Sequence, residues 1–444
     1  MDEECEDVTI PGKWGELERA ARASKGRYPI HRYNGDARGP TALCFSRDSA
    51  LVANGACGHV GIRGAASGKV IGNCRWNGSV GEKGYSEYKD GYMKHFMQSL
   101  AFSPDGRYIF AGDSRGNVYA WDVATTALRW DHRPGLAHGS NPMTGTWGYP
   151  SAPGTNAVAV SPDGRIVASG GNDGHVKAWE ARTGALVADV EMATAGRPWV
   201  PWPDTDPHRV WTYPYTNAPQ SPRAWFCVYS LAFSPDGRWL ACGMGGANDI
   251  RDAVYAIDTR TWAPRSIAKY INLKHPYPRN PKEILDTYGQ VDVLDFSPNG
   301  RWLASSGVEG VRLYKIPAAG TAVAAHVNGG GGKESESESE WKVGEVVGYD
   351  YWSDVDGDEF RGWATQGRFV NDKVLALLLE GGFIQLIEIY DDEGGWKEKA
   401  VIDIRCKGDV FSLDKVLAAS PDGRWLAAGR DTGFSVVDIG TLAR

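Results

Sequence analysis

Apolar and polar residues alternate along this chain in short runs separated by tight turns. Five segments share one pattern, an apolar strand that ends in Ser-Pro-Asp-Gly-Arg or Ser-Pro-Asn-Gly-Arg: Ser99–Arg107, Ala157–Arg165, Ser230–Arg238, Val293–Arg301 and Val416–Arg424. Two looser copies are Ala42–Ser49 and Gly367–Lys373. Serine, proline and glycine suit the first, second and fourth positions of a type I turn. Each copy therefore predicts two antiparallel strands joined by a short hairpin.

Two further strands follow each hairpin. A second apolar strand such as Tyr108–Gly112 leads through a turn to a third strand such as Asn117–Val123, and Ala127–Trp130 is an example of a fourth. Four-stranded units that repeat in this way are the blades of a ring. Counting the copies predicts an all-β fold, a seven-bladed β-propeller of four-stranded antiparallel blades.

The motifs also suggest a family. The Ser-Pro-Asp-Gly turns, with Trp121-Asp122 and Trp179-Glu180 at the ends of third strands, resemble WD40 repeats from about residue 41 to residue 444. The resemblance implies the fold and is nearly silent on function. The Gly-His dipeptide usual before the first strand of a WD40 repeat is missing, and other third strands end in Ile257-Asp258, Tyr314-Lys315 and Val437-Asp438. We therefore expect the hydrogen-bond networks of WD40 blades to be incomplete here.

The chain reads as one propeller domain over residues 1–444, with an N-terminal segment at 1–40 and the seven repeats at 41–444. The last repeat reaches Thr441–Arg444 before its fourth strand has formed. An open sheet edge in a ring needs a partner strand. We expect a strand from the N-terminal segment, around Cys5–Ile10, to complete the last blade and close the ring.

The repeats are longer than the roughly 40–45 residues of a plain WD40 repeat. Consecutive first strands are spaced by 57, 58, 73, 63, 74 and 50 residues, measured between Phe45, Phe102, Val160, Phe233, Phe296, Val370 and Ser420. Most of the surplus falls between the fourth strand of one blade and the first strand of the next. In a propeller these connections all leave from one face, so the insertions near 77–97, 131–155, 191–228, 270–289 and 350–365 should gather above the central channel.

These insertions are rich in large aromatic residues. The candidate binding residues are Trp147, Tyr149, Trp199, Trp202, Trp211, Tyr213, Tyr215, Trp225, Tyr277, Trp352 and Trp363. Disordered segments are poor in aromatics, so we expect these loops to be ordered against one another. Tryptophan and tyrosine dominate binding hot spots, which favours a recognition surface. Self-packing of the rings onto the propeller is an equally good interpretation, and different residues could serve each role.

One insertion has a different composition. Residues 321–340 contain Gly329–Gly332 followed by a Ser-Glu alternation, which cannot form a core. If Trp341–Gly348 is the fourth strand of the fifth blade, this segment is a loop on the opposite face. We predict that it is disordered.

Candidate catalytic residues are few. If the protein is an enzyme, His95, Asp204, Asp206, His208 and His275 are the first candidates, because they lie on the insertions and could converge. No His-Glu-x-x-His, paired cysteine or comparable spacing supports a metal, and we expect neither a metal nor another cofactor. Asp354, Asp356 and Asp358 resemble a calcium loop but lack its glycine and closing glutamate, so only a weak site outside the EF-hand pattern remains open there.

Charge and cysteine content limit the partners and the compartment. The net charge is −7, and no basic stripe balances the acidic runs Met1–Asp7, Glu334–Glu340 and Asp350–Glu359, so we expect no nucleic-acid partner. The seven cysteines form no Cys-x-x-Cys pair, no signal peptide is readable, and no apolar run approaches the roughly 20 residues of a membrane span. A cytoplasmic location, with a nuclear one as the alternative, and no membrane partner are the expectation.

The leading hypothesis is an interaction scaffold that binds a protein or peptide partner on its aromatic face, as the WD40 resemblance implies. The alternative is a small-molecule-binding protein or enzyme whose site the insertions roof over the central channel. Glycan binding by exposed tryptophans is a weaker third hypothesis, because nothing indicates secretion.

Overall fold

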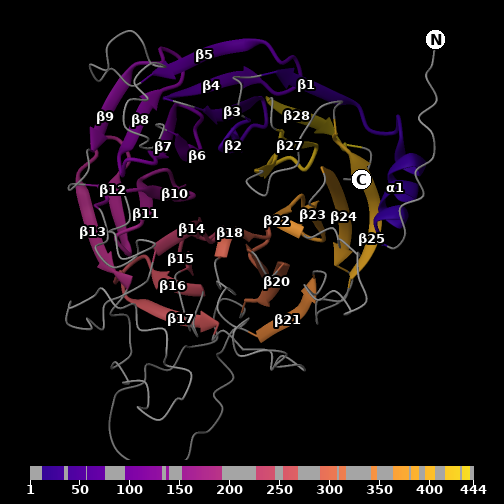
Figure 1. Ribbon diagram of the computed structural model, residues 1–444. Helices are drawn as coiled ribbons and strands as arrows, with labels where there is room; N and C mark the ends of the chain where they lie inside the picture. Colours follow the sequence, from indigo (N-terminus) through magenta and orange to yellow (C-terminus); the bar gives the residue numbers. More distant parts are fainter. Residues whose placement is uncertain are drawn as a thin grey trace, which may run out of the picture.

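The computed structural model describes residues 13–34, 39–56, 58–75, 96–132, 137–139, 153–192, 227–245, 254–268, 291–307, 310–316, 342–347, 364–379, 382–389, 396–405, 416–430 and 433–440. These residues form seven antiparallel sheets of four strands each, arranged as a ring around one axis (Figure 1). The predicted seven-bladed β-propeller is confirmed. We call the strands of a blade a, b, c and d from the channel outward.

The first four blades follow the chain in order. Blade 1 is β2 (Ala42–Phe45), β3 (Leu51–Ala56), β4 (His59–Gly64) and β5 (Val70–Arg75). Blade 2 is β6 (Met97–Phe102), β7 (Tyr108–Asp113), β8 (Val118–Asp122) and β9 (Leu128–His132). Blade 3 is β10 (Thr155–Val160), β11 (Ile166–Gly171), β12 (His175–Glu180) and β13 (Leu186–Glu191). Blade 4 is β14 (Cys227–Phe233), β15 (Trp239–Gly245), β16 (Val254–Asp258) and β17 (Pro264–Ala268).

The last three blades complete the ring. Blade 5 is β18 (Val291–Phe296), β19 (Trp302–Gly307), β20 (Gly310–Lys315) and β21 (Lys342–Val347), so residues 321–340 connect strands c and d and lie outside the described residues. Blade 6 is β22 (Ala364–Phe369), β23 (Val374–Leu379), β24 (Phe383–Ile389) and β25 (Trp396–Asp403). Blade 7 is β26 (Leu417–Ala419), β27 (Trp425–Arg430), β28 (Gly433–Asp438) and, as its outer strand, β1 (Ile30–Asn34).

The outer strand of blade 7 lies elsewhere in the sequence than we expected. β1 pairs antiparallel with β28, with Ile30 opposite Val437 and Asn34 opposite Gly433. The expected strand around Cys5–Ile10 lies outside the described residues. β1 is the last strand before β2 in the chain, as strand d of each other blade is the last strand before the next strand a. Residues near position 10 are separated from β2 by a helix as well as by β1.

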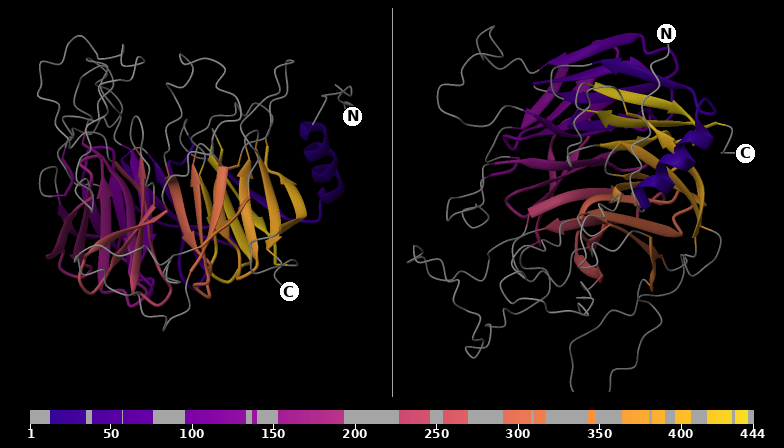
Figure 2. Two further views of the ribbon diagram at one scale, coloured as in Figure 1. Left: turned by 90° about the horizontal axis from the view of Figure 1, so that it is seen from below. Right: turned by 45° about the vertical axis from the view of Figure 1, so that its right-hand side comes forward.

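That helix, α1 (Lys13–Ser24), was not anticipated from the sequence. It stands against β25 on the outer edge of blade 6 (Figures 1 and 2). Leu17 and Ala21 are buried there in the same core cluster as Val401. Glu18 accepts a 3.2 Å hydrogen bond from Arg405, which also pairs with Asp403 at 2.6 Å. The helix therefore covers one exposed sheet edge with an apolar contact and an ion pair.

Strand register corrects two of the equivalences read from the sequence. Phe369 pairs with Leu375 and Ala419 pairs with Leu426, as Phe45 pairs with Val52. The ends of strands a in blades 6 and 7 are therefore Phe369 and Ala419, one residue before the predicted Val370 and Ser420. The blade 6 turn, Val370–Lys373, has neither the serine nor the proline that mark the end of strand a in blades 2 to 5.

The cores of the blades are apolar and lie between neighbouring sheets. In blade 2, Trp121, Tyr119 and Phe110 are fully buried, and their strands pack against blades 1 and 3. Cys74, Cys227 and Cys242 are buried and Cys44 is half-buried, all with free thiols. Those four cysteines serve as small apolar residues, as expected from their strand positions. Burial raises the pKa of the Cys44 and Cys74 thiols to about 12, which makes them poor nucleophiles.

A polar side chain also connects the inner part of each blade to the next. At three junctions the side chain donates to a main-chain oxygen of the neighbouring blade: Thr41 to Met97, Asn156 to Val228 and Ser230 to Val291. At the other four it accepts from a main-chain N–H: Ser99 from Val158, Ser306 from Gly367, Gln366 from Leu417 and Ser49 from Asp422. The seven distances are 2.6–3.1 Å. Every one of these hydrogen bonds joins a side chain to the main chain of a neighbouring blade. Six of them lie in or next to strands a and b, whereas Ser49 and Asp422 join the a–b turns of blades 1 and 7 on the opposite rim.

Candidate functional site

The two rims of the ring carry different connections. Met97, at the start of a strand a, pairs with Asp113 at the end of the neighbouring strand b, and His132, at the end of a strand d, pairs with Val118 at the start of strand c. The b–c turns, the ends of strands d and the starts of strands a therefore share one rim. The a–b turns lie on the other. Sheet order puts each of the five long insertions between a strand d and the next strand a.

The residues predicted to form the site all lie outside the described residues. This holds for the aromatic set Trp147, Tyr149, Trp199, Trp202, Trp211, Tyr213, Tyr215, Trp225, Tyr277, Trp352 and Trp363. It holds equally for the catalytic candidates His95, Asp204, Asp206, His208 and His275. The strands that flank them are described, so the structure defines the rim from which these insertions leave.

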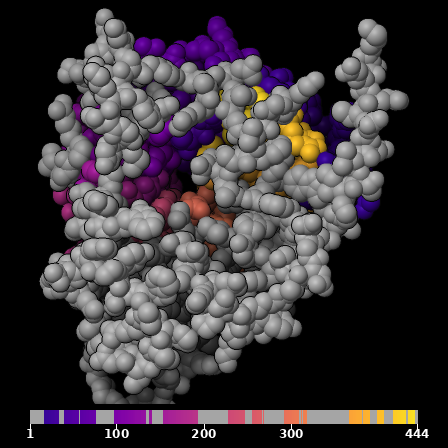
Figure 3. Space-filling view, viewed as in Figure 1, coloured from indigo at the N-terminus to yellow at the C-terminus, as the bar shows by residue number. Residues whose placement is uncertain are grey.

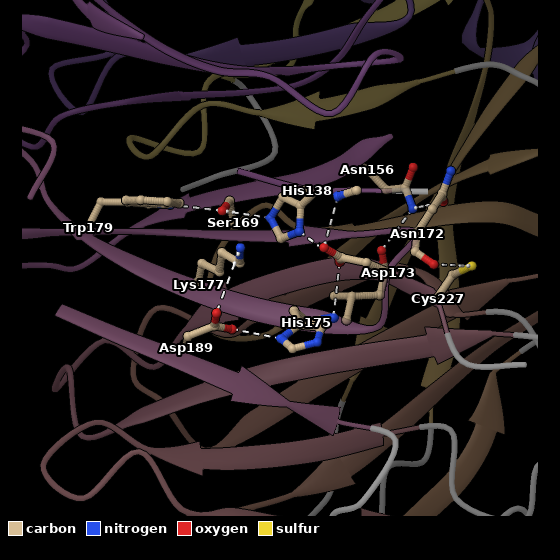
Figure 4. Close-up of polar contacts among 12 residues, drawn as sticks. His138, Asn156, Ser169, Asn172, Asp173, His175, Lys177, Trp179, Asp189 and Cys227 are labelled. Carbon is tan, nitrogen blue, oxygen red and sulfur yellow. Dashed lines mark hydrogen bonds and ion pairs between the residues drawn. The ribbon is translucent and has the colours of Figure 1, made fainter. Parts of the chain in front are cut away.

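The main polar cluster on that rim belongs to blade 3 (Figure 4). His138 is fully buried, with Nδ1 2.9 Å from Asp173 Oδ1 and Nε2 2.9 Å from Ser169 Oγ. Trp179 Nε1 donates a 2.9 Å hydrogen bond to the same Ser169 oxygen. The four residues form one continuous hydrogen-bonded chain from the core of the blade to its b–c turn.

The sequence led us to expect incomplete hydrogen-bond networks within the blades. For blade 3 this expectation is wrong. The histidine was missed because Ala137 rather than glycine precedes it and because it lies 17 residues before the start of β10. The usable signal was Trp179 at the end of strand c together with Asp173 in the preceding turn. In the b–c turn of blade 2, different residues form the hydrogen bonds. Asp113 accepts hydrogen bonds from Asn117 and from the hydroxyl of Tyr119.

Asp173, His138 and Ser169 have the order and spacing of an acid–base–nucleophile triad, but their surroundings exclude that role. Ser169 is fully buried. The Ser169 oxygen accepts a hydrogen bond from Trp179 Nε1. Because His138 Nδ1 donates to the Asp173 carboxylate, His138 Nε2 is an acceptor, and the Ser169 hydroxyl donates its proton to it. A nucleophile must meet its substrate, and this hydroxyl meets only protein. The network is structural.

Electrostatics agree with a fixed carboxylate at Asp173. Burial alone would raise the pKa of this group, but the hydrogen bonds from His138 and from the main-chain N–H groups of Gly139 and His175 outweigh burial and hold the pKa below its ordinary value. Asp173 thus ties the 137–139 segment to the b–c turn of blade 3. This segment is part of the insertion between β9 and β10.

Neighbouring side chains extend the cluster along the rim. Asn156 donates to Asn172 Oδ1 at 2.8 Å, and Cys227 Sγ lies 3.5 Å from Asn172 O. On the outer strands of the same blade, Asp189 pairs with His175 at 2.7 Å and with Lys177 at 3.7 Å. The described part of the rim on blade 3 is therefore rigidly cross-linked. Across the described residues, no group of three or more His, Cys, Asp or Glu side chains is arranged to hold a metal ion.

Known proteins support this assignment of fold. The model of the family "WD domain, G-beta repeat" matches residues 91–122, 146–180 and 220–250. The chain is also similar to the protein groucho of Drosophila melanogaster, with 26% identity over 164 residues, which are 34% of this chain and 20% of that protein. The match thus spans about a fifth of the length of this curated relative.

Solved structures agree at low sequence identity. The β-propeller domain of Cps50 (Swd1) from Myceliophteria thermophila is 14% identical, with a TM-score of 0.55 over 92% of this chain and 98% of that one. The WD40 repeats of RRP9 are 12% identical, with a TM-score of 0.56 over 92% of this chain and 97% of that one. A chain of the mitotic checkpoint complex is 14% identical, with a TM-score of 0.54 over 93% of this chain and 91% of that one.

The three matches to the WD40 family model confirm the resemblance seen in the sequence. The described residues form a seven-bladed β-propeller, with long insertions between its blades. In the described part of the chain no helix is both long and apolar enough to cross a membrane.

Proposed function

We propose that the protein is an interaction scaffold that binds a protein or peptide partner on the rim where strands d lead into strands a. The observation that carries the proposal is the sheet order, in which five insertions rich in tryptophan and tyrosine all connect a strand d to the next strand a. Large rigid aromatic side chains bury area at low entropic cost, which suits a docking surface. A rigid ring presents such a surface without reorganisation on binding.

A partner-capture experiment tests this proposal. Immobilised full-length protein should retain a stoichiometric protein partner from an extract of its source cells, and the Trp202→Ala/Trp211→Ala variant should lose it. The matched control is Tyr108→Ala/Trp239→Ala, which removes two half-buried aromatics at the starts of strands b, on the opposite rim. Equal retention by all three proteins would exclude the aromatic insertions as the docking surface.

The rival function, a small-molecule site or enzyme roofed by the same insertions, makes a different prediction. A metabolite pool should then raise the melting temperature of the isolated protein, and substitution of His208 or Asp204 should abolish the increase. The location in the cytoplasm or nucleus and the absence of nucleic-acid and membrane partners are part of the same proposal.

A further inference from the structure

At one level of the channel wall, small side chains surround a single charged pair. Strands a line the channel, and register puts one residue of each at a common level: Cys44, Ala101, Ala159, Ala232, Asp295, Arg368 and Ala418. Five of these seven side chains are alanine or cysteine. Only Asp295 and Arg368 carry charge, and they belong to adjacent blades 5 and 6. In Figure 3 the centre of the ring is hollowed, and residues of β18 lie at its edge.

Arg368 is held in place from both sides. Its Nη1 donates to Leu294 O at 3.1 Å in blade 5, and its Nε donates to Leu417 O at 3.2 Å in blade 7. Both acceptors are main-chain carbonyls of inner strands, so the guanidinium is fixed across the wall of the channel. About 29% of the side chain stays exposed, and because the residue lies on an innermost strand this area borders the channel.

The neighbouring carboxylate neutralises this arginine only in part. Asp295 Oδ1 lies 3.9 Å from Arg368 Nη1, whereas Asp295 Oδ2 accepts a 2.7 Å hydrogen bond from the main-chain N–H of Phe369. The stronger contact of the carboxylate is therefore with the backbone. Among the described residues no acceptor pairs with Arg368 Nη2. A guanidinium that is partly removed from water and incompletely paired attracts an anion more strongly than one on the open surface.

We propose that the channel is a binding site for an oxyanion, a carboxylate or phosphate group, with Arg368 as its anchor. Arg368 contributes a planar donor edge that the two carbonyls hold in position before binding. The neighbour on one side at this level, Ala418, is small, and Asp295 on the other side limits the affinity by repelling the ligand. The proposal uses residues of strands a alone and none of the aromatic insertions, so it does not depend on the proposed function.

Calorimetric titration of the full-length protein tests the site with two probes, inorganic phosphate and a four-glutamate peptide. The expected result is binding of at least one probe, weakened roughly tenfold or more in Arg368→Met, which corresponds to the loss of one charge-assisted contact. The control is Arg165→Met, which removes an 84% exposed guanidinium from an a–b turn and should leave binding unchanged. Binding of phosphate alone supports a free-ion ligand, and binding of the peptide alone supports a carboxylate side chain.

A second variant keeps the test decisive if Arg368→Met fails to fold, since that arginine also bridges three blades. Asp295→Asn removes the repelling charge and retains an acceptor for Phe369 N–H, so the same probes should bind several-fold tighter. Failure of both probes to bind the native protein, or equal affinities in the native, Asp295→Asn and Arg368→Met proteins, would overturn the proposal. The Trp202→Ala/Trp211→Ala variant should bind the probes normally, which separates this site from the docking surface.

Discussion

At the scale of single residues, the buried hydrogen bonds of blade 3 contribute to the stability of the fold. Ser169→Ala leaves Trp179 Nε1 and His138 Nε2 without their common partner inside the blade. A buried polar group without its partner costs about 1–3 kcal/mol. We therefore expect the free energy of unfolding in urea to fall by about that amount. Ser67→Ala, on the exposed c–d turn of blade 1, should change it by less than about 0.5 kcal/mol. Equal effects would contradict the structural role of the network.

Asp295 makes the stability depend on pH in an unusual direction. Burial in the channel raises its pKa to about 6, more than Arg368 and the Phe369 N–H lower it. Because the folded-state pKa lies above the ordinary value, the protonated form is favoured in the fold. This contribution to stability is therefore fully present at acidic pH and is lost as the pH rises through about 6. Asp295→Asn should stabilise the protein by about 1–3 kcal/mol at pH above 7 and change little near pH 4.

Asp163→Asn is the matched comparison for this pH dependence. Burial raises the pKa of Asp163, but hydrogen bonds from the Ser161 hydroxyl and the Arg165 N–H outweigh it and lower the pKa. Its contribution is present at neutral pH and lost on acidification, so the substitution should destabilise at neutral pH. Melting temperatures measured across the pH range would separate the two signs. A parallel pH profile for both variants would contradict the assignment of Asp295.

At the scale of elements, the Ser-Pro-Asp-Gly turns are contacts between blades as well as hairpins. A methyl group added at Gly164, Gly237 or Gly300 would lie 3.3–3.6 Å from the proline of the preceding blade. Blades 1 and 6 have Arg47 and Asn371 at the proline position, and the space beside Gly106 in blade 2, which follows blade 1, is correspondingly empty. Proline and glycine of successive turns therefore pack against each other from blade 2 to blade 5.

Two alanine substitutions separate backbone strain from this packing. Gly106 and Gly423 both have positive φ, +69° and +71°, so alanine strains each by about 1 kcal/mol. At Gly106 nothing lies within 4 Å, whereas at Gly423 the new methyl group would lie 2.8 Å from Val370 O of blade 6. Gly423→Ala should therefore lower the melting temperature clearly more than Gly106→Ala. Equal losses would show that the turns do not pack between blades.

The same elements explain which parts of the fold were predictable. Turn residues and apolar alternation are local, so the hairpins, the blade count and the fourth strand near Trp341–Gly348 followed from the sequence. α1 was missed because only its contact with β25 buries Leu17 and Ala21. His138 was missed because its partners are distant in sequence and meet it only in the folded blade. The candidate aromatic residues stay predictions, since they lie outside the described residues.

At the scale of the whole molecule, the two rims of the ring differ in their connections. The a–b rim is made of short turns that pack on one another, while the d–a rim carries the long insertions. The N-terminal segment belongs to two blades at once, through α1 on blade 6 and β1 in blade 7. A partner that docks on the d–a rim, as proposed, therefore binds to a ring that resists deformation. This division is the central claim of the account.

Hydrogen–deuterium exchange of the protein with and without its captured partner tests that claim most directly. The account predicts that the partner slows exchange in the insertions near 131–155 and 191–228 and at the starts of β10 and β14. Exchange in the a–b turns, such as Ser103–Arg107 and Ser234–Arg238, should be unchanged. Protection concentrated in those a–b turns, with the insertions unaffected, would contradict it.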